Sequence, residues 1–413
     1  MSSLNNKKEG FISIFSGSGG LDLGLETAGL QPLLSVEIDL ICQETLKLNK
    51  PKVKLSSEGD INNLSSNQLM KEAKVKRGEL DLLVGGPPCQ PFSKSSYWAN
   101  SKNSRMNDPR ANCLIEFMRV VNDLLPKVVL IENVTGIGYS NKNDGLNFIY
   151  SEFERINEQN NTQFNPIIET INTADFGVPQ LRRRVFIIAC RDGEGFQFPE
   201  PRFNNDDNAK RKLPNYRTAW DAIGDLDSDI YENDLKLKGK WADLLPSIPE
   251  GKNYLWHTEK MGGLPLFGWR TRYWSFLLKL AKDKPSWTIT ASPGPATGPL
   301  HWKNRYLSVR ELARLQTYPD TYRFAGNHRD QHKQIGNSVP PAIGELLGLE
   351  IRRQVFKRQV RKSLRLIPKA RRPNEKKDKV HDVNDKYLDL IAEHQEHPGV
   401  GKGPGAAKAL KGV

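Results

Sequence analysis

A single cysteine stands in a loop whose composition restricts the backbone on both sides of it. Residues 85–93 read Gly-Gly-Pro-Pro-Cys-Gln-Pro-Phe-Ser and follow an apolar run, residues 80–84, that is typical of a buried strand. The two glycines allow a sharp turn, and the prolines fix φ around Cys89. An isolated Pro-Pro-Cys would indicate only a proline-rich turn, but the whole nonapeptide after a strand predicts a positioned thiol nucleophile.

A glycine-rich turn near the N-terminus predicts a nucleotide-binding unit. An apolar run at residues 11–15 leads into Ser-Gly-Ser-Gly-Gly, and a helical pattern follows and ends at Gly29. Glycines allow a close approach of the backbone to a ligand, and the first turn of a helix offers free N–H groups. The dinucleotide fingerprint would require glycine where Asp22 stands, so NAD is disfavoured. A nicotinamide oxidoreductase would also leave the Cys89 loop unexplained.

Carboxylates stand at the ends of further predicted strands. Glu37 lies twenty residues after Gly17, where α/β folds place an acid that binds ribose hydroxyls. Asp60 could accept a hydrogen bond from an adenine amino group, and Glu132 follows the apolar run at 128–131. Each of these could instead be a solvated acid at the end of a strand. The glycine turn and the cysteine loop favour the functional interpretation.

Apolar runs alternate with helical patterns through the first half of the chain. The predicted strands are residues 11–15, 32–36, 80–84, 128–131, 166–171 and 185–189, and the predicted helices are residues 111–125 and 145–158. This alternation predicts an α/β protein with a doubly wound, mostly parallel sheet. Before the last strand, residues 180–184 read Gln-Leu-Arg-Arg-Arg, and strand alternation places Gln180, Arg182 and Arg184 on one face.

The pattern changes after residue 198. Residues 199–300 are rich in Pro, Gly, Trp and Tyr and show no strand–helix alternation, which indicates a smaller second domain. Order returns at residues 307–318, where Ser308 and Glu311 form a capping box at the start of a helix. An apolar helix follows the sequence Gly-Asn-Ser-Val-Pro-Pro.

The net charge of +13, with an isoelectric point near 9.4, predicts a polyanionic partner. Residues 351–379 hold thirteen Lys or Arg and two acidic residues, so this segment carries +11 and the rest of the chain +2. Val355, Val360 and Leu364 would lie on one side of a helix there. The segment is interpreted as a basic helix that binds the polyanionic partner or, alternatively, as a solvated helix that caps the first domain.

The spacing of the cysteines and the hydropathy of the chain argue against several other classes of protein. Four cysteines form no Cys-x-x-Cys pair, which argues against structural zinc and against a disulfide scaffold. No apolar run approaches the roughly 20 residues needed to cross a bilayer, and the N-terminus lacks the apolar stretch of a signal peptide. We therefore expect a soluble, cytoplasmic protein without a membrane partner.

Eight short motifs occur in the order in which the DNA (cytosine-5) methyltransferases carry them, and the chain resembles that family over roughly residues 11–198 and 285–350. The motifs are FSGSGG at 15–20, VEID at 36–39, GDI at 59–61, GGPPCQPFS at 85–93, ENV at 132–134, QLRRR at 180–184, RELARLQTYPD at 310–320 and GNSVPP at 336–341. One departure is Ser13, where many members carry Asp.

The resemblance implies a Rossmann-like, S-adenosyl-L-methionine-dependent methyltransferase domain with a smaller target-recognition domain. The implied segments are a catalytic domain at 1–198, a target-recognition domain at 199–300, a return to the catalytic domain at 301–350, a basic C-terminal segment at 351–383 and a flexible tail at 384–413. The family folds the motif at 336–341 back beside the first glycine turn. The implied type is a bacterial or phage enzyme of a restriction–modification system.

The resemblance also assigns roles to individual residues. The implied catalytic residues are Cys89, Glu132, Arg184 and Arg182. The implied cofactor-binding residues are Phe15, Gly17, Gly19, Gly20, Leu21, Glu37, Ile38, Asp60, Ile61, Pro88, Asn337 and Val339. The implied DNA-binding residues are Gln90, Ser93 and Ser95. The implied cofactor is S-adenosyl-L-methionine without a metal ion, and the implied partners of this expected monomer are double-stranded DNA and a cognate restriction endonuclease.

The chemistry of cytosine is consistent with these residue types. C5 is too poor a nucleophile to attack a methylsulfonium, but a thiolate that adds to C6 turns the ring into an enamine whose C5 can attack. The base must leave the duplex to be reached. Two alternatives remain, a tRNA methyltransferase and an inactive DNA-binding homologue. The tRNA enzymes typically carry Cys-Phe-Thr in the recognition region, which is absent here, and the intact Cys89, Glu132 and Arg184 argue against an inactive homologue.

Overall fold

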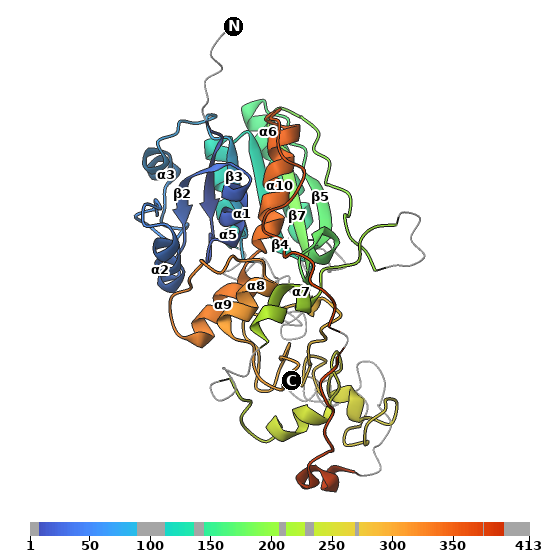
Figure 1. Cartoon of the computed structure of the whole chain (residues 1–413). Coiled ribbons are helices and arrows are strands. Elements are labelled where there is room, and N and C mark those ends of the chain that lie inside the picture. Colours follow the sequence, from blue (N-terminus) through green and yellow to red (C-terminus); the bar gives the residue numbers. More distant parts are fainter. Residues whose placement is uncertain are drawn as a thin grey trace.

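The computed structural model describes residues 8–88, 112–135, 144–205, 212–227, 235–268, 272–374 and 376–391. Figure 1 shows a sheet flanked by helices in the upper part of the molecule and a lower part with little regular structure. Within the described ranges, no helix combines the length and the apolar character that crossing a membrane requires.

Six strands form the central sheet in the order β2-β1-β3-β4-β7-β5. Their bounds are β1 Gly10–Ile14, β2 Gln31–Val36, β3 Leu82–Gly85, β4 Val128–Val134, β5 Ile167–Asn172 and β7 Arg183–Cys190. The first four run parallel to one another, whereas β7 pairs antiparallel with both β4 and β5. The predicted doubly wound α/β sheet is therefore confirmed, with β7 as an antiparallel strand that the sequence pattern did not indicate.

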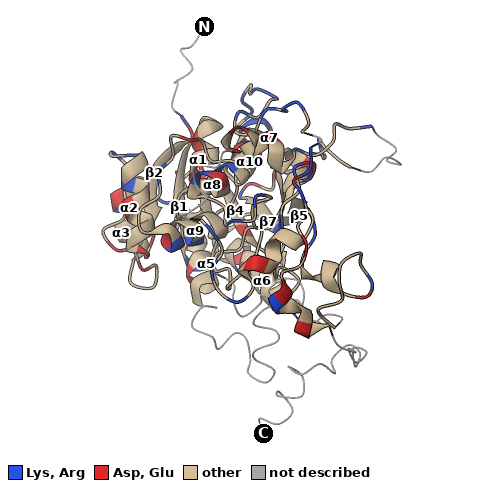
Figure 2. Ribbon diagram, turned by 60° about the horizontal axis from the view of Figure 1, so that its bottom comes forward, with Lys and Arg blue, Asp and Glu red and all other residues tan. Residues whose placement is uncertain are grey.

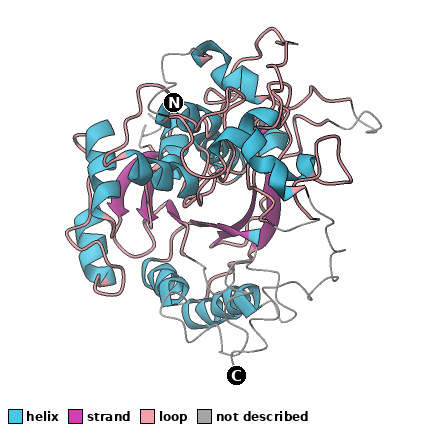
Figure 3. Cartoon of the chain, turned by 90° about the horizontal axis from the view of Figure 1, so that it is seen from below, coloured by secondary structure: helices cyan, strands magenta, loops and turns pink. Residues whose placement is uncertain are grey.

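Helices cover both faces of this sheet, as Figure 3 shows in a view from below. One face packs against α3, α5 and α6, and the other packs against α1 and α10. The bounds are α1 Gly20–Thr27, α3 Ser66–Ala73, α5 Asn112–Leu124, α6 Asp144–Asn160 and α10 Pro341–Gln354. The central strands are nearly continuous apolar runs because alternate side chains enter opposite cores: Leu83 and Val129 enter one core, and Leu82 and Val128 enter the other.

The lower part holds short helices and a second, aromatic core. Its regular elements are α7 Ala219–Ile223 and the 3-10 helices η5 Gly224–Leu226, η7 Ala242–Ser247 and η8 Tyr254–His257, with α8 Val309–Leu315 and α9 His328–Asn337 between it and the sheet. A two-residue strand, β8 Ser286–Trp287, pairs with β6 Gln180–Leu181. Most side chains of the small core come from residues 237–300, and Trp241, Phe267 and Phe276 pack together there.

The chain after α10 does not form the basic helix that Val355, Val360 and Leu364 suggested, so that prediction is wrong. Helix α10 ends at Gln354, and the described residues of 355–379 contain no helix. The extended path arises because carboxylates elsewhere hold the segment: Glu345 accepts the N–H groups of residues 365 and 366. We call the described residues of 355–391 the C-terminal strap.

Several basic side chains of the strap pair with carboxylates elsewhere in the protein. Arg358 pairs with Glu9, and Arg371 pairs with Asp225. Figure 2 shows basic segments along the loops around α7, where the strap passes. These ion pairs weaken the expectation that the segment is a free DNA-binding helix.

The prediction of a flexible tail at 384–413 fails for its first residues. Residues 385–390 form the 3-10 helix η9, and Tyr387 is buried in it. Tyr387 belongs to the aromatic core of the lower part, which holds the chain in place. No periodic pattern indicates this contact, because one aromatic residue in a polar stretch has no period. Residues 392–413 lie outside the described ranges.

Candidate active site

A cavity of about 780 Å³ lies at the carboxyl ends of β1, β2, β3 and β4, on the side of α9. Its wall brings together Phe15, Gly17, Gly20, Leu21, Glu37, Ile38, Pro88, Glu132, Arg184, Asn337 and Val339 from the predicted site. Carboxyl ends of parallel strands are where open α/β sheets bind ligands. The cavity therefore lies where the sequence motifs placed the site.

The glycine turn has the backbone that its sequence requires. Gly17 and Gly19 adopt left-handed φ values of 54° and 73°, a region that glycine enters without strain. Position 20 requires glycine for lack of space, because a Cβ there would lie 2.0 Å from the Oγ of Ser338. That contact shows that the motif at 336–341 lies against the first turn, as expected.

Two tyrosines connect these distant motifs beneath the cavity. Tyr318 has its hydroxyl 3.0 Å from the Oγ of Ser18 and 2.6 Å from that of Ser338. Tyr322 donates to the carbonyl of Ser18. Both rings are buried. Tyr318 of the RELARLQTYPD motif and Tyr322, just after it, thus supply hydroxyl groups that hold the turn, a role that the sequence alone did not reveal.

Glu37 lies at the end of β2 and faces the turn. Its carboxylate accepts the N–H of Gly17 at 2.6 Å and the N–H of Asp39 at 2.8 Å. Burial raises the pKa of Glu37, although these backbone hydrogen bonds oppose the rise. Each carboxylate oxygen can accept a second hydrogen bond, so Glu37 retains capacity for a hydroxyl group in the cavity.

Asp22 is a buried carboxylate on the cavity wall. In the sequence it was noted only because it stands where the dinucleotide fingerprint requires glycine. Ser13 donates its hydroxyl to Asp22 at 2.7 Å, and Ser35 donates at 3.4 Å. Ser16, inside the glycine turn, donates to the carbonyl of Ser13 at 3.2 Å. Asp22 on α1 therefore places a carboxylate beside the hydroxyl group of Ser13.

We predict that Asp22→Asn stabilises the protein increasingly as the pH rises from about 4 to 6. Burial raises the pKa of Asp22 from 3.8 to about 6, with Lys50 opposing and Glu26 adding to the shift. The folded state therefore holds the proton more tightly than the unfolded state, and ionisation costs about 3 kcal/mol above pH 6. Urea unfolding at several pH values measures the difference from wild type. The exposed Asp192→Asn is the control, and an Asp22→Asn difference that is constant with pH would contradict the assignment.

Glu132 and Arg184 form an ion pair on the wall of the same cavity. The Nε of Arg184 lies 3.0 Å from an Oε of Glu132, and both side chains keep a small exposed fraction. Burial raises the pKa of Glu132, while the guanidinium groups of Arg184 and Arg182 oppose the rise. Gly86 makes room for this carboxylate, because a Cβ there would lie 3.0 Å from its other Oε. The pair presents one acid and one fixed cation to the cavity.

Asn133, beside Glu132, is a functional candidate that sequence reasoning passed over. It is buried, and its Nδ2 donates to the carbonyl of Pro87 at 3.3 Å. The Glu-Asn-Val motif thus fixes the base of the loop that leads to Cys89. Asn133 is part of the Glu-Asn-Val motif, but a side-chain amide that donates to one backbone carbonyl has no characteristic sequence spacing by which its role could be recognised.

Four predicted residues do not lie on the described wall of the cavity: Gly19, Asp60, Ile61 and Arg182. Asp60 accepts hydrogen bonds from Asn62, and Ile61 is buried in the core. Arg182 is fully buried and donates to the carbonyls of Ile289 at 3.2 Å and Gly336 at 2.9 Å. We infer that Arg182 positions neighbouring segments and does not touch a base.

The predicted nucleophile Cys89 and the predicted DNA contacts Gln90, Ser93 and Ser95 lie outside the described residues. The other three thiols, of Cys42, Cys113 and Cys190, are described. Burial raises the pKa of all three, and that of Cys190 reaches about 11. Thiols that stay protonated at neutral pH are poor nucleophiles. In the described ranges, no three His, Cys, Asp or Glu side chains gather as metal ligands would.

Comparison with known proteins gives consistent matches. The sequence model of one protein family, described as C-5 cytosine-specific DNA methylase, matches residues 10–353 of the chain. The chain is 36% identical over 364 residues to the type II methyltransferase M.SacI of Streptomyces achromogenes, covering 81% of this chain and 90% of that protein. It is 32% identical over 348 residues to the type II methyltransferase M1.HphI of Haemophilus parahaemolyticus, covering 82% and 85%.

Solved structures support the fold alone. A DNA modification methyltransferase encoded within an Escherichia coli prophage superposes with a TM-score of 0.57 at 22% identity, covering 84% of this chain and all of that chain. A Spodoptera frugiperda DNMT2 variant superposes with a TM-score of 0.58 at 18% identity, covering 83% of this chain and all of that chain.

Proposed function

Because the chain belongs to the C-5 cytosine-specific DNA methylase family, we propose that it transfers a methyl group from S-adenosyl-L-methionine to C5 of a cytosine flipped out of duplex DNA. The observation that carries the proposal is the pairing of Glu132 and Arg184 on the wall that also holds the glycine turn and Glu37. One cavity thus offers groups for a pyrimidine on one side and for a nucleoside on the other.

The residues present fit the cofactor. Phe15 offers an aromatic face, and Glu37 offers a carboxylate for hydroxyl groups. A Cβ at Gly17 would meet no atom within 4 Å, so the turn borders open space. Asp22, Glu37 and Asp39 place three carboxylates on this part of the wall, which suits a ligand that carries a sulfonium and an ammonium group. When bound, S-adenosyl-L-methionine supplies an electrophilic methyl group.

The side chains of this protein would then carry the cytosine through addition and elimination. The thiolate of Cys89 forms a bond to C6, and Glu132 shares a proton with N3 as negative charge develops on the ring. Arg184 binds the base carbonyl and keeps Glu132 in place. C5 gains the methyl group as the methyl–sulfur bond breaks, with S-adenosyl-L-homocysteine as the leaving group. A base then removes the proton from C5, and the electron pair of that C–H bond re-forms the C5–C6 double bond and expels the Cys89 thiolate.

The proposed partner is double-stranded DNA, with a cognate restriction endonuclease that acts on the same site. The names of the relatives M.SacI and M1.HphI as type II methyltransferases support this pairing. The proposed location is the cytoplasm of a bacterium or of a phage-infected cell. RNA as substrate is the alternative, and the absence of Cys-Phe-Thr in the sequence disfavours it.

Expression of the protein with a plasmid library, followed by bisulfite sequencing, tests the proposed function. The expected result is one cytosine protected in a short shared sequence, with protection lost in Cys89→Ser. A parallel assay with tRNA and labelled cofactor tests the alternative. Methyl transfer to tRNA without transfer to DNA would overturn the proposal.

Sequence specificity should depend on residues 199–300. The segment lacks the sheet pattern and mixes aromatic with basic residues, such as Arg272 and Trp274, that could read base edges. Exchange of this segment for that of a relative with another target should move the methylated site and leave cofactor affinity unchanged. Bisulfite sequencing and calorimetry measure the two effects. A folded, active hybrid that keeps the original site would place specificity elsewhere.

A further inference from the structure

The C-terminal strap crosses from the sheet domain to the lower part of the molecule. It leaves α10 after Gln354 and ends at η9, which Figure 1 shows at the bottom of the molecule. The strap is attached at successive points along this path. Each attachment uses buried or specifically paired groups, which distinguishes the strap from a solvated tail.

The upper attachment is a buried carboxylate on α10. Glu345 is fully buried and accepts the N–H of Arg365 at 2.8 Å, the N–H of Leu366 at 3.0 Å and the guanidinium of Arg361. Leu366 and Ile367 pack against the core between α10 and the sheet. Glu345 thus turns the strap onto the sheet domain.

The middle attachment is at α7 and η5. The N–H of Arg371 donates to the carboxylate of Asp221 at 2.7 Å, and its guanidinium donates to the carboxylate of Asp225 at 2.7 Å. The indole N–H of Trp220 donates to the carbonyl of Arg372 at 3.1 Å. The strap therefore follows α7 from the sheet domain toward the lower part.

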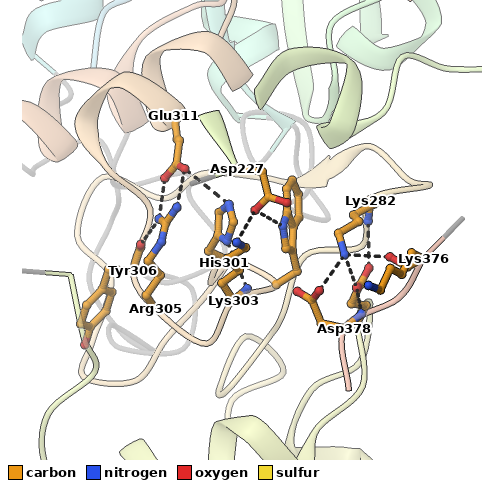
Figure 4. Close-up of polar contacts among 11 residues, drawn as sticks. Asp227, Lys282, His301, Lys303, Arg305, Tyr306, Glu311, Lys376 and Asp378 are labelled. Carbon is orange, nitrogen blue, oxygen red and sulfur yellow. Dashed lines mark hydrogen bonds and ion pairs between the residues drawn. The ribbon is translucent and has the colours of Figure 1, made fainter. Parts of the chain in front are cut away.

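Figure 4 shows the next attachment, a buried cluster around Lys282. The Nζ of Lys282 donates to Glu250 at 3.0 Å, to the Oδ of Asp378 at 3.1 Å and to the carbonyl of Lys376 at 3.0 Å. The N–H of Asp378 donates to the same carboxylate of Glu250 at 2.9 Å. Lys282 and Glu250 each have 4% of the side chain exposed. Removal of one partner would leave a buried charge uncompensated.

The last attachment is an aromatic one. Tyr387 has 2% of its surface exposed, stacks on Trp241 at 5.9 Å with an interplanar angle of 6°, and donates its hydroxyl to the carbonyl of Lys240 at 2.6 Å. It packs in the same core as Phe267 and Phe276. Tyr387 is thus a core residue of the lower part, although it lies more than 80 residues further along the sequence than the other buried residues of that core.

Besides the buried core in which α7 packs with α8 and α9, the lower part has connections to the sheet domain through β8 and Arg305. In its described residues, β8 offers only a two-residue pairing with β6. Figure 4 shows a second connection, in which Glu311 of α8 accepts two hydrogen bonds from Arg305 at 2.7 and 2.8 Å. The strap adds a route from α10 that is independent of both.

We propose that the C-terminal strap belongs to the target-recognition unit and positions this unit relative to the catalytic cavity, with Tyr387 and Asp378 as positioning residues for DNA. The inference rests on the proposed function of residues 199–300. The unit that recognises the target sequence and the cavity that receives the cytosine must stay at a fixed distance from each other. A displacement of about 1 Å at a distance from the chemistry can lower a rate by about a hundredfold.

The test compares three full-length variants. Tyr387→Ala removes the stacked ring, Tyr387→Phe removes only the hydroxyl, and Leu388→Ala truncates an exposed neighbour in the same 3-10 helix. Tyr387→Ala should lower kcat/KM for the target duplex by about tenfold to a hundredfold and reduce discrimination against duplexes with one altered base pair. Cofactor affinity by calorimetry should stay within about twofold of wild type. Tyr387→Phe and Leu388→Ala should behave like wild type.

A second measurement needs neither DNA nor cofactor. Hydrogen exchange should accelerate in Tyr387→Ala at residues 242–247 and 276–280 and remain unchanged in β1, β3 and β4. If Tyr387→Ala does not fold, Asp378→Asn replaces it, with the exposed Asp382→Asn as control. Unchanged exchange together with wild-type discrimination would overturn the inference. If the wild type methylates no DNA, the proposed function fails, and the exchange measurement still decides whether the strap holds the lower part.

Discussion

Replacement of Cys89 by serine is expected to reduce turnover to below detection and to abolish the covalent complex with DNA that carries 5-fluorocytosine at the target. Fluorine at C5 replaces the proton whose loss would release the enzyme, so methyl transfer leaves a stable protein–DNA adduct. A serine hydroxyl is scarcely ionised at neutral pH and does not add to C6. Denaturing electrophoresis of the protein with labelled duplex measures the adduct, which should require both the cofactor and the target cytosine.

The other three cysteines provide the matched controls. Burial raises the pKa of Cys42, Cys113 and Cys190, so none of them is expected to supply a thiolate at neutral pH. Replacement of each by alanine should leave the adduct yield largely unchanged, with a loss of stability at the buried Cys42 and Cys190. A normal adduct yield from Cys89→Ser would refute both the mechanism and the role assigned to this loop.

The sheet could be predicted because its strands are buried on both faces and read as short apolar runs between turns. The cavity could be placed because Glu37 and Glu132 stand at the ends of such runs, where parallel strands end at one edge. The antiparallel direction of β7 could not be predicted, because strand direction depends on tertiary pairing and not on local periodicity. Asp22 could not be predicted as a site residue, because its hydrogen-bond partner, Ser13, lies on another element.

The C-terminal strap shows the other limit of sequence reasoning. A basic run with Val355, Val360 and Leu364 at helical spacing has the pattern of an amphipathic helix, yet tertiary contacts determine its path. Glu345 takes up the backbone N–H groups that a helix would use internally. Contacts between Tyr387 and Trp241 join positions nearly 150 residues apart, and no local pattern encodes such a separation.

Glu132→Gln is expected to slow adduct formation by on the order of 10²- to 10⁴-fold while the affinity for target DNA is retained. The amide preserves the size of the side chain and can still form hydrogen bonds to the base, but it cannot share a proton with N3. Single-turnover formation of the 5-fluorocytosine adduct measures the rate, and fluorescence anisotropy of a labelled duplex measures the affinity. Glu169→Gln, at an exposed position on β5, is the matched control.

The pH dependence of the same reaction separates this role from a structural one. Burial raises the pKa of Glu132, so its carboxyl group keeps a proton to a higher pH than an exposed glutamate would. If the protonated form assists at N3, the rate of adduct formation should fall as the pH rises through the pKa of Glu132, and Glu132→Gln should lack that fall. Arg184 should favour the ionised form, because its Nε lies 3.0 Å from the carboxylate. Arg184→Met should therefore shift the fall toward higher pH, and a wild-type rate and pH profile in Glu132→Gln would exclude the carboxyl group from the reaction.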